Sequence, residues 1–301
     1  MLWLIFAFSG PVLWAASTHI DKYLVDKYFG ASPVAVLLIF TALIGLLTLP
    51  VIAWLMPRAT TVPPEDAALM ALAGVLYMVG MLFYLQALRA EDASAVAPFF
   101  QASPLIGYVL GYLVLGERLS SMQMIGGILI IGGTALVSLQ PGRKLSFKRS
   151  LVALMLGAAL MLAVSSLIFK VFALRADFWS TTFWMYVGEG AFGALLPAIP
   201  SIRKELYRLL KASPGAVLSI NAVNELINLA GSLGARYALI LAPLSLVQAI
   251  GSTTTLFVFV IGLGLSWLFP RHAGEPLGRS DLLRKAGAAI IVAIGAYLVS
   301  R

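Results

Sequence analysis

The 301-residue chain contains no cysteine and only two histidines, His19 and His272. The absence of cysteine excludes disulfide bonds, thiol chemistry and metal sites with cysteine ligands. The chain also has no HExxH sequence, so a metal centre built from histidine side chains is not expected. We therefore expect neither a metal ion nor another cofactor.

Charged residues are also scarce, at 11% of the chain, whereas a soluble domain has about 25%. Hydrophobic residues make up 60% of the chain, and the mean hydropathy is +0.96. This composition is typical of a protein that crosses a membrane several times. The net charge of +8 does not indicate nucleic acid binding, because the basic residues lie in short loops, where they set membrane orientation.

Ten apolar segments are long enough to cross a bilayer, since a helix needs roughly 20 residues to do so. The connections between them are short, and no soluble domain fits anywhere in the chain. The sequence therefore predicts an all-α integral membrane protein with ten transmembrane helices. The predicted spans are 2–24, 33–56, 67–88, 93–115, 120–139, 151–174, 178–200, 214–238, 243–269 and 281–300.

Lysine and arginine are unevenly shared between the two sets of connections. Most of them fall in the first, third, fifth, seventh and ninth connections, and short loops rich in these residues stay in the cytoplasm. We therefore expect a multi-pass protein of the cytoplasmic membrane with both termini outside. The opposite side carries only Arg58, Arg118, Arg175, Arg236 and Arg301.

The two halves of the chain resemble each other. The segment ALRAEDASAVAPFFQASPL from Ala87 aligns with ALILAPLSLVQAIGSTTTL from Ala238, and GGTALVS, ending at Ser138, aligns with AIGAYLVS, ending at Ser300. Each half then holds five spans, so the second half enters the membrane upside down. This arrangement predicts two inverted five-helix repeats, residues 1–140 and 141–301, with a substrate site at their interface.

The stretch ASAVAPFFQASPLIGYVLGYLVLGERLS, followed by IGGILIIGGTALVS, resembles the EamA domain of the drug/metabolite transporter superfamily. Its most typical mark is the step Gly116, Glu117, Arg118, whose place in the second half is taken by GLSWLFPRH. The resemblance covers the chain as two EamA repeats. It implies ten helices and secondary transport of a small metabolite, and many members of the superfamily have both termini in the cytoplasm.

Polar residues recur on one face of the eighth predicted span, at Asn221, Asn224, Glu225 and Asn228. Their spacing of three or four residues places them on one side of a helix. An ionisable group at mid-membrane costs at least ~2.5–3.5 kcal/mol, so it is expected to face a cavity or a partner. We interpret this face as the lining of a substrate site, while a polar seam between packed helices is the alternative.

Glu189, between Gly188 and Gly190, is a second carboxylate near the middle of a span. Glycines allow a ligand or another backbone to approach closely. Burial in a low-dielectric interior favours the protonated form of a carboxylate, so Glu189 and Glu225 together could exchange a proton or cation with a substrate. The alternative for Glu189 is a structural ion pair with Lys170 or Arg236.

The remaining candidates are aromatic or uncharged polar residues. Tyr77 and Tyr84 share a helix face and could form a stacking or cation–π wall, or simply pack against neighbours. Gln101, Gln248 and Ser252 occupy repeat-related spans and are expected near the midplane. The first span adds Trp14 and His19, and His19 could titrate near neutral pH or lie at headgroup level.

These features favour a secondary transporter for a small polar or amphipathic metabolite, such as an amino acid or an amine, with proton or cation coupling left open. A lipid-linked sugar flippase of the same superfamily is the alternative. An intramembrane enzyme has less support, because the chain lacks a Gly-x-Ser-x-Gly elbow, a phosphate loop and aspartate-rich segments. The expected partners are the small-molecule substrate and membrane lipid.

Overall fold

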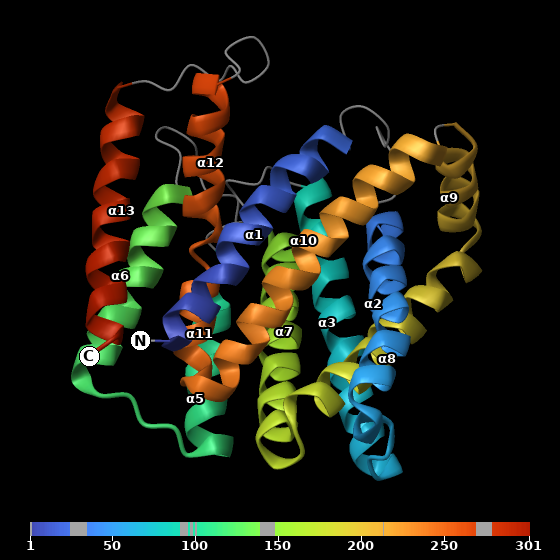
Figure 1. Ribbon diagram of the computed structural model, residues 1–301. Helices are drawn as coiled ribbons and strands as arrows, with labels where there is room; N and C mark the ends of the chain where they lie inside the picture. Colours follow the sequence, from blue (N-terminus) through green and yellow to red (C-terminus); the bar gives the residue numbers. More distant parts are fainter. Residues whose placement is uncertain are drawn as a thin grey trace.

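The computed structural model describes residues 2–24, 35–90, 96, 99, 101–138, 148–212, 214–268 and 279–301. These ranges are helical apart from short turns, and they contain no strand. Figure 1 shows a bundle of helices with both chain termini in the lower half of the view. The long helices are α1 (Leu2–Leu24), α2 (Ala35–Leu55), α3 (Pro64–Ala90), α6 (Ser121–Ser138), α7 (Arg149–Arg175), α8 (Phe178–Leu195), α10 (Pro214–Leu241) and α13 (Arg279–Val299). Shorter helices are α5 (Ala102–Leu115), α9 (Pro200–Ala212), α11 (Leu244–Gly251) and α12 (Thr254–Leu268), with 3-10 turns η2 (Pro57–Thr60) and η4 (Leu196–Ala198).

Within the described residues, seven segments are long and apolar enough to cross a membrane. They comprise α1, α2, α3, α6, α7, α13 and the stretch Leu244–Ser266 that includes α11 and most of α12. The fourth predicted span appears as the shorter apolar helix α5, and its first residues lie largely outside the described ranges. Helices α8 and α10 are also long, but they carry the buried polar residues discussed below. The protein is therefore a multi-pass helical membrane protein, and the count of ten spans stays a prediction.

The ninth predicted span is not one continuous helix. It is divided at Ser252 and Thr253 into α11 and α12. At the division, the Thr253 N–H and hydroxyl both donate to the carbonyl of Ile250, which tightens the last turn of α11.

The connection predicted at 201–213 is largely helical. Helix α9 forms there because its apolar residues recur on one face, with Ile202 and Leu209 buried against α2 and α10 and the basic side chains outward. The seventh span ends earlier than predicted, at Leu195, since Pro197 lies in the 3-10 turn that follows.

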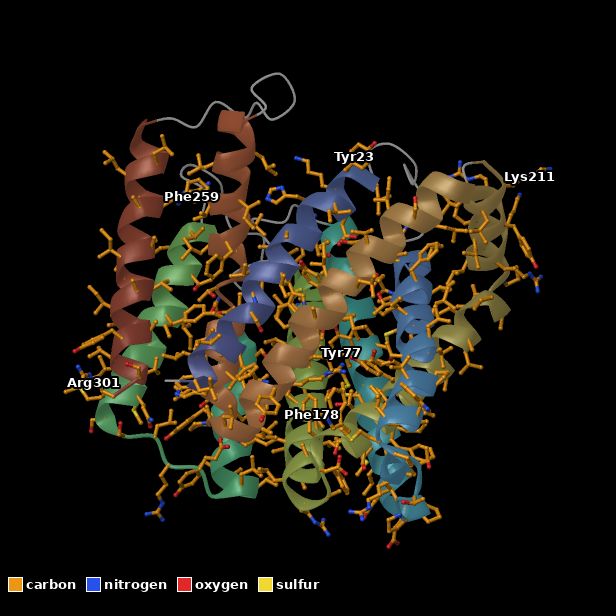
Figure 2. The ribbon with its side chains drawn as sticks, in the orientation of Figure 1. Tyr23, Tyr77, Phe178, Lys211, Phe259 and Arg301 are labelled. Atoms are coloured by element: carbon orange, nitrogen blue, oxygen red, sulfur yellow. The ribbon has the colours of Figure 1, made fainter. Side chains whose placement is uncertain are left out.

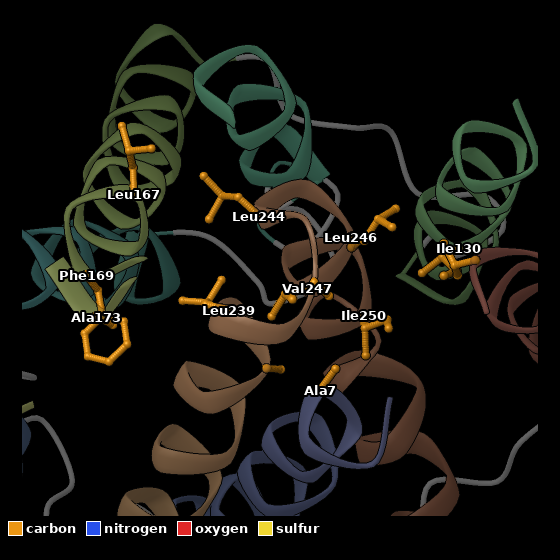
Figure 3. Close-up of a cluster of buried hydrophobic side chains, with 14 of the residues drawn as sticks. Ala7, Ile130, Leu167, Phe169, Ala173, Leu239, Leu244, Leu246, Val247 and Ile250 are labelled. Carbon is orange, nitrogen blue, oxygen red and sulfur yellow. The ribbon is translucent and has the colours of Figure 1, made fainter. Parts of the chain in front are cut away.

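Helices from the first half pack mainly against helices from the second half. The closest partners are α1 with α10, α3 with α7 and α8, α2 with α8, and α6 with α13. Helix α11 lies in the centre and packs on α5. Figure 3 shows its residues Leu244, Leu246, Val247 and Ile250 in the main apolar cluster, together with residues of α1, α6, α7 and α10.

Glycines bring two of these helix pairs into backbone contact. A Cβ added to Gly74 of α3 would lie 2.0 Å from the carbonyl oxygen of Met185, and one added to Gly188 of α8 would lie 1.9 Å from that of Ala71. Gly126 and Gly295 meet in the same way where α6 crosses α13. No larger residue fits at these crossings without moving the helices apart.

Candidate functional site

The polar face of α10 points into the protein. Asn224 is 1% exposed and Glu225 6%, and Asn221 is also buried, whereas Leu226 on another face is 53% exposed. Asn228 lies one turn further along and is half-buried. The prediction that these residues share an inward face of one helix is confirmed, although the lining of a cavity stays a prediction.

An acidic cluster forms where this face meets α1 and α2. The Asn224 Nδ2 donates a hydrogen bond of 2.7 Å to the Asp21 Oδ1, and the Thr41 hydroxyl donates one of 3.1 Å to the Glu225 Oε1. We use the name acidic cluster for Asp21, Thr41, Asn224 and Glu225. It joins two helices of the first half to one of the second.

The acidic cluster is rich in acceptors and poor in donors. The Glu225 Oε2 and the Asn224 Oδ1 are buried and accept no hydrogen bond from the described part of the chain. No lysine, arginine or histidine of the described residues forms an ion pair with Asp21 or Glu225. Each carboxylate accepts a hydrogen bond, but neither has a cationic partner among the described residues, which leaves acceptor atoms available to a ligand.

Glu189 has a different environment, because Arg236 of α10 neutralises it. The Arg236 Nη2 lies 2.6 Å from the Glu189 Oε1, and both side chains are almost fully buried. The Arg236 guanidinium also lies 4.9 Å from the ring centroid of Tyr186, 5.7 Å from that of Tyr77 and 5.8 Å from that of Phe169. Such rings attract a cation through their π faces.

This geometry shows which ion pair Glu189 forms, while its role in a substrate site stays a prediction. The ion pair with Arg236 is present, and the one with Lys170 is not. Arg236 is also not a loop residue that reports on membrane orientation, because it lies inside α10 and is 8% exposed. The sequence-based count of loop charges was wrong at this position.

The ion pair and the acidic cluster belong to one polar region. The carboxylates of Asp21 and Glu189 both interact electrostatically with Glu225, and that of Asp21 does so more strongly. Tyr77 interacts electrostatically with Glu189, Arg236 and Glu225. Figure 2 places Tyr77 in the middle of the bundle. Glu225 and Arg236 share a face of α10 three turns apart, which is about 16 Å along the helix axis.

The other predicted candidates divide between this region and the helix interfaces. Tyr84 interacts electrostatically with the Asp21 carboxylate. Trp14 instead packs against Gly231, so its indole fills the contact between α1 and α10. His19 turns toward α12, where its Nε2 lies 3.0 Å from the Val258 carbonyl oxygen.

The two glutamines lie at the contact of α5 and α11. Gln101 directly precedes α5 and is buried, and Gln248 of α11 packs against Gly107. The Oε1 of each has no hydrogen-bond partner among the described residues. Ser252, at the break after α11, donates to the carbonyl of Ala249. No contact joins these residues to the acidic cluster within the described part of the chain.

Glu117, the glutamate of the EamA-like Gly-Glu-Arg step, holds a second buried ion pair. Its Oε1 lies 2.5 Å from the Lys170 Nζ, and its Oε2 accepts a hydrogen bond of 2.9 Å from the Leu244 N–H. Lys170 also donates to the carbonyl of Ala242. Glu117 and Lys170 therefore fasten the turn after α5 to the turn between α10 and α11. The sequence analysis gave neither residue this role.

The chain was compared with known proteins. A model of the EamA-like transporter family matches residues 1–139. The permease-like protein YdzE of Bacillus subtilis (strain 168) is 38% identical over 56 residues, which are 19% of this chain and 72% of that protein. The chain belongs to the EamA-like transporter family.

Two further similarities extend this comparison. An uncharacterized transporter in the cobO 3' region of Sinorhizobium sp is 31% identical over 81 residues, which are 27% of the EamA-like chain and 57% of that relative. The chain thus matches just over half the length of that protein. A crystal structure of a protein that is 17% identical superposes with a TM-score of 0.66, covering 98% of this chain and 94% of the other, and it shows a shared fold.

Proposed function

We propose that this EamA-like protein is a secondary transporter that carries a small polar or amphipathic metabolite across the cytoplasmic membrane by alternating access. The observation that carries the proposal is the buried acidic cluster at the meeting point of α1, α2 and α10, where the Glu225 Oε2 and the Asn224 Oδ1 accept no hydrogen bond from the described residues. A purely structural seam would satisfy its own hydrogen bonds, because an unsatisfied buried polar group costs about 1–3 kcal/mol.

The proposal includes two inverted repeats, residues 1–140 and 141–301. The packing of α1 on α10 and of α3 on α7 supports it, because these contacts join the first span to the eighth and the third to the sixth. A two-fold axis between two five-span halves exchanges those two pairs. The acidic cluster then lies at the repeat interface, where transporters of this architecture bind their substrates.

Coupling to a proton or cation rests on Glu225 and Asp21 in this scheme. Glu189 is already neutralised by Arg236, so it is a poor partner for exchange. The neighbouring carboxylates that interact electrostatically with Glu225 include Asp21 and Glu189, and Thr41 and Asn228 are its hydrogen-bonding neighbours. Two neighbouring carboxylates do not both ionise readily, and a shared proton can leave when a cation arrives.

Cysteine labelling tests whether the polar face is accessible from water. Single cysteines at 221, 224 and 228 should react with a small charged thiol reagent, and the native chain has no cysteine to interfere. Cysteines at Ala222 and Leu226, which lie on outward faces of α10, are the matched controls and should react weakly in the lipid-embedded protein. Equal protection at all five positions would favour a sealed structural seam.

The role of Glu225 in coupling is tested by Glu225→Gln. This substitution keeps the size and the hydrogen bond from Thr41 but removes the titratable charge. A metabolite that stabilises the purified protein in a thermal-shift screen would be loaded into proteoliposomes, and its transport followed across a range of pH values. We expect the variant to lose pH dependence, whereas Glu65→Gln, at an exposed position of α3, keeps it. An unchanged profile in Glu225→Gln would refute the exchange role.

A further inference from the structure

We infer that the acidic cluster binds a protonated amine, and this inference rests on the proposed transport function. Asn224, the residue before Glu225 on α10, donates to Asp21 of α1, so the two carboxylates belong to one cluster. Neither has a cationic partner among the residues that the structure describes. The site therefore carries up to two negative charges that no cation in this part of the chain compensates.

An independent observation at the same place is the orientation of Asn224. Its amide nitrogen donates to Asp21, which holds the Asn224 side chain in the acidic cluster. Asn224 is 1% exposed, and its Oδ1 has no donor within the described chain. This buried acceptor, together with the two carboxylates, favours a ligand that brings hydrogen-bond donors as well as positive charge.

A protonated amine meets both requirements. An alkylammonium group has three N–H donors and no acceptor. The Asp21 carboxylate, the Asn224 Oδ1 and the Glu225 Oε2 offer three acceptors, and the last two have no hydrogen-bond partner among the described residues. Charge-assisted hydrogen bonds of this kind are stronger than neutral ones.

Two tyrosines of α3 bring aromatic rings to this part of the bundle. The charge of Asp21 acts on Tyr84, and that of Glu225 acts on Tyr77. Aromatic rings offer apolar surface and stacking partners. An amine with a flat apolar body is therefore the probe of choice.

A carboxylate on the substrate is not required by this geometry. Arg236 is the nearest buried cation on α10, but it lies about 16 Å along the helix from Glu225. It is already paired with Glu189. Because Arg236 is committed to Glu189, the site should favour an amine over the corresponding zwitterion.

The test uses the purified full-length chain and three probes that share a phenyl group. 2-Phenylethylamine is protonated at pH 7, 2-phenylethanol is its neutral analogue, and phenylalanine is zwitterionic. We expect 2-phenylethylamine to bind in a calorimetric titration, and the alcohol and the zwitterion to bind at least about tenfold more weakly, because they lose charge-assisted bonds or gain repulsion. Equal or tighter binding of the alcohol or zwitterion would overturn the inference, as would binding of Na⁺ without binding of the amine.

Two variants locate the binding site. Asp21→Asn and Glu225→Gln should each weaken binding of 2-phenylethylamine at least about tenfold, while Glu65→Gln should leave it unchanged. Folded variants with unchanged affinity would refute the assignment. If both variants fail to fold, the comparison of amine and alcohol on the native protein still decides the inference. The transport proposal itself is contradicted if cysteines on the polar face of α10 resist labelling and no metabolite stabilises the protein. If those cysteines are labelled and another metabolite binds, but no amine does, only the present inference is contradicted.

Discussion

The buried ion pair of Glu189 and Arg236 should dominate the stability of the central polar region. Replacing Arg236 with methionine removes the cation and leaves the Glu189 carboxylate buried without a partner. Loss of one partner of a buried pair costs about 3–5 kcal/mol. At about 2–4 °C for each kcal/mol, the apparent midpoint of thermal unfolding should fall by roughly 6–20 °C.

The reverse substitution should cost less. In Glu189→Gln the guanidinium keeps the three rings of Tyr77, Phe169 and Tyr186, and each ring can contribute up to about 2 kcal/mol to a desolvated cation. We therefore expect Glu189→Gln to lower the midpoint by less than Arg236→Met does. The double variant should lose less stability than the two single variants lose in sum, because it leaves no uncompensated buried charge.

The assay is loss of monodisperse protein in detergent after heating at one fixed rate, for the native chain, both single variants and the double variant. Arg58→Met, which removes an exposed arginine in η2, is the control and should change stability by no more than about 0.5 kcal/mol. Losses that simply add in the double variant would show that Glu189 and Arg236 are not coupled, and the assignment of Glu189 to a structural pair would then be wrong.

Three further predictions follow from other parts of the structure. Lys170→Met should lower the unfolding midpoint, because it leaves Glu117 and the carbonyl of Ala242 without their donor, and retained stability would refute a fastening role for this pair. Gly188→Ala should prevent normal folding or expression, since its Cβ would overlap the α3 backbone, whereas Gly132→Ala, which has open space, should fold as well as the native chain. A phosphatase fused after Arg301 should be active and a fluorescent protein at the same place dark, while the opposite pattern would show that the C-terminus is cytoplasmic.

Periodicity and composition predicted the features that depend on one helix at a time. The apolar runs indicated a multi-pass helical protein, and the spacing of Asn221, Asn224 and Glu225 placed them correctly on an inward face. Both signals arise from the order of residues within one segment, so they can be detected without knowing which helices pack against that segment. The family resemblance, carried by Ala93–Ser120, was likewise a local signal.

Contacts between distant helices could not be predicted in this way. Asp21 lies three residues before the end of α1, where an acidic residue is easily taken for a headgroup contact, and only its bond to Asn224 identifies it as part of a site. Arg236 was assigned to a loop because it lies near the end of the predicted span at 214–238, whereas α10 continues to Leu241. The pairing of Glu117 with Lys170 depends on how α5 and α7 meet in space.

The backbone contact of α3 with α8 also limits how this transporter can move. Gly74 is three residues before Tyr77, and Gly188 is adjacent to Glu189, so the crossing lies directly beside the central ion pair. Helices locked at one crossing cannot slide past each other, but they can tilt about that point. Displacements in such a lever grow with distance from the pivot. We therefore expect the largest movements at the outer ends of the helices, while the Glu189–Arg236 pair stays at a constant depth in the membrane.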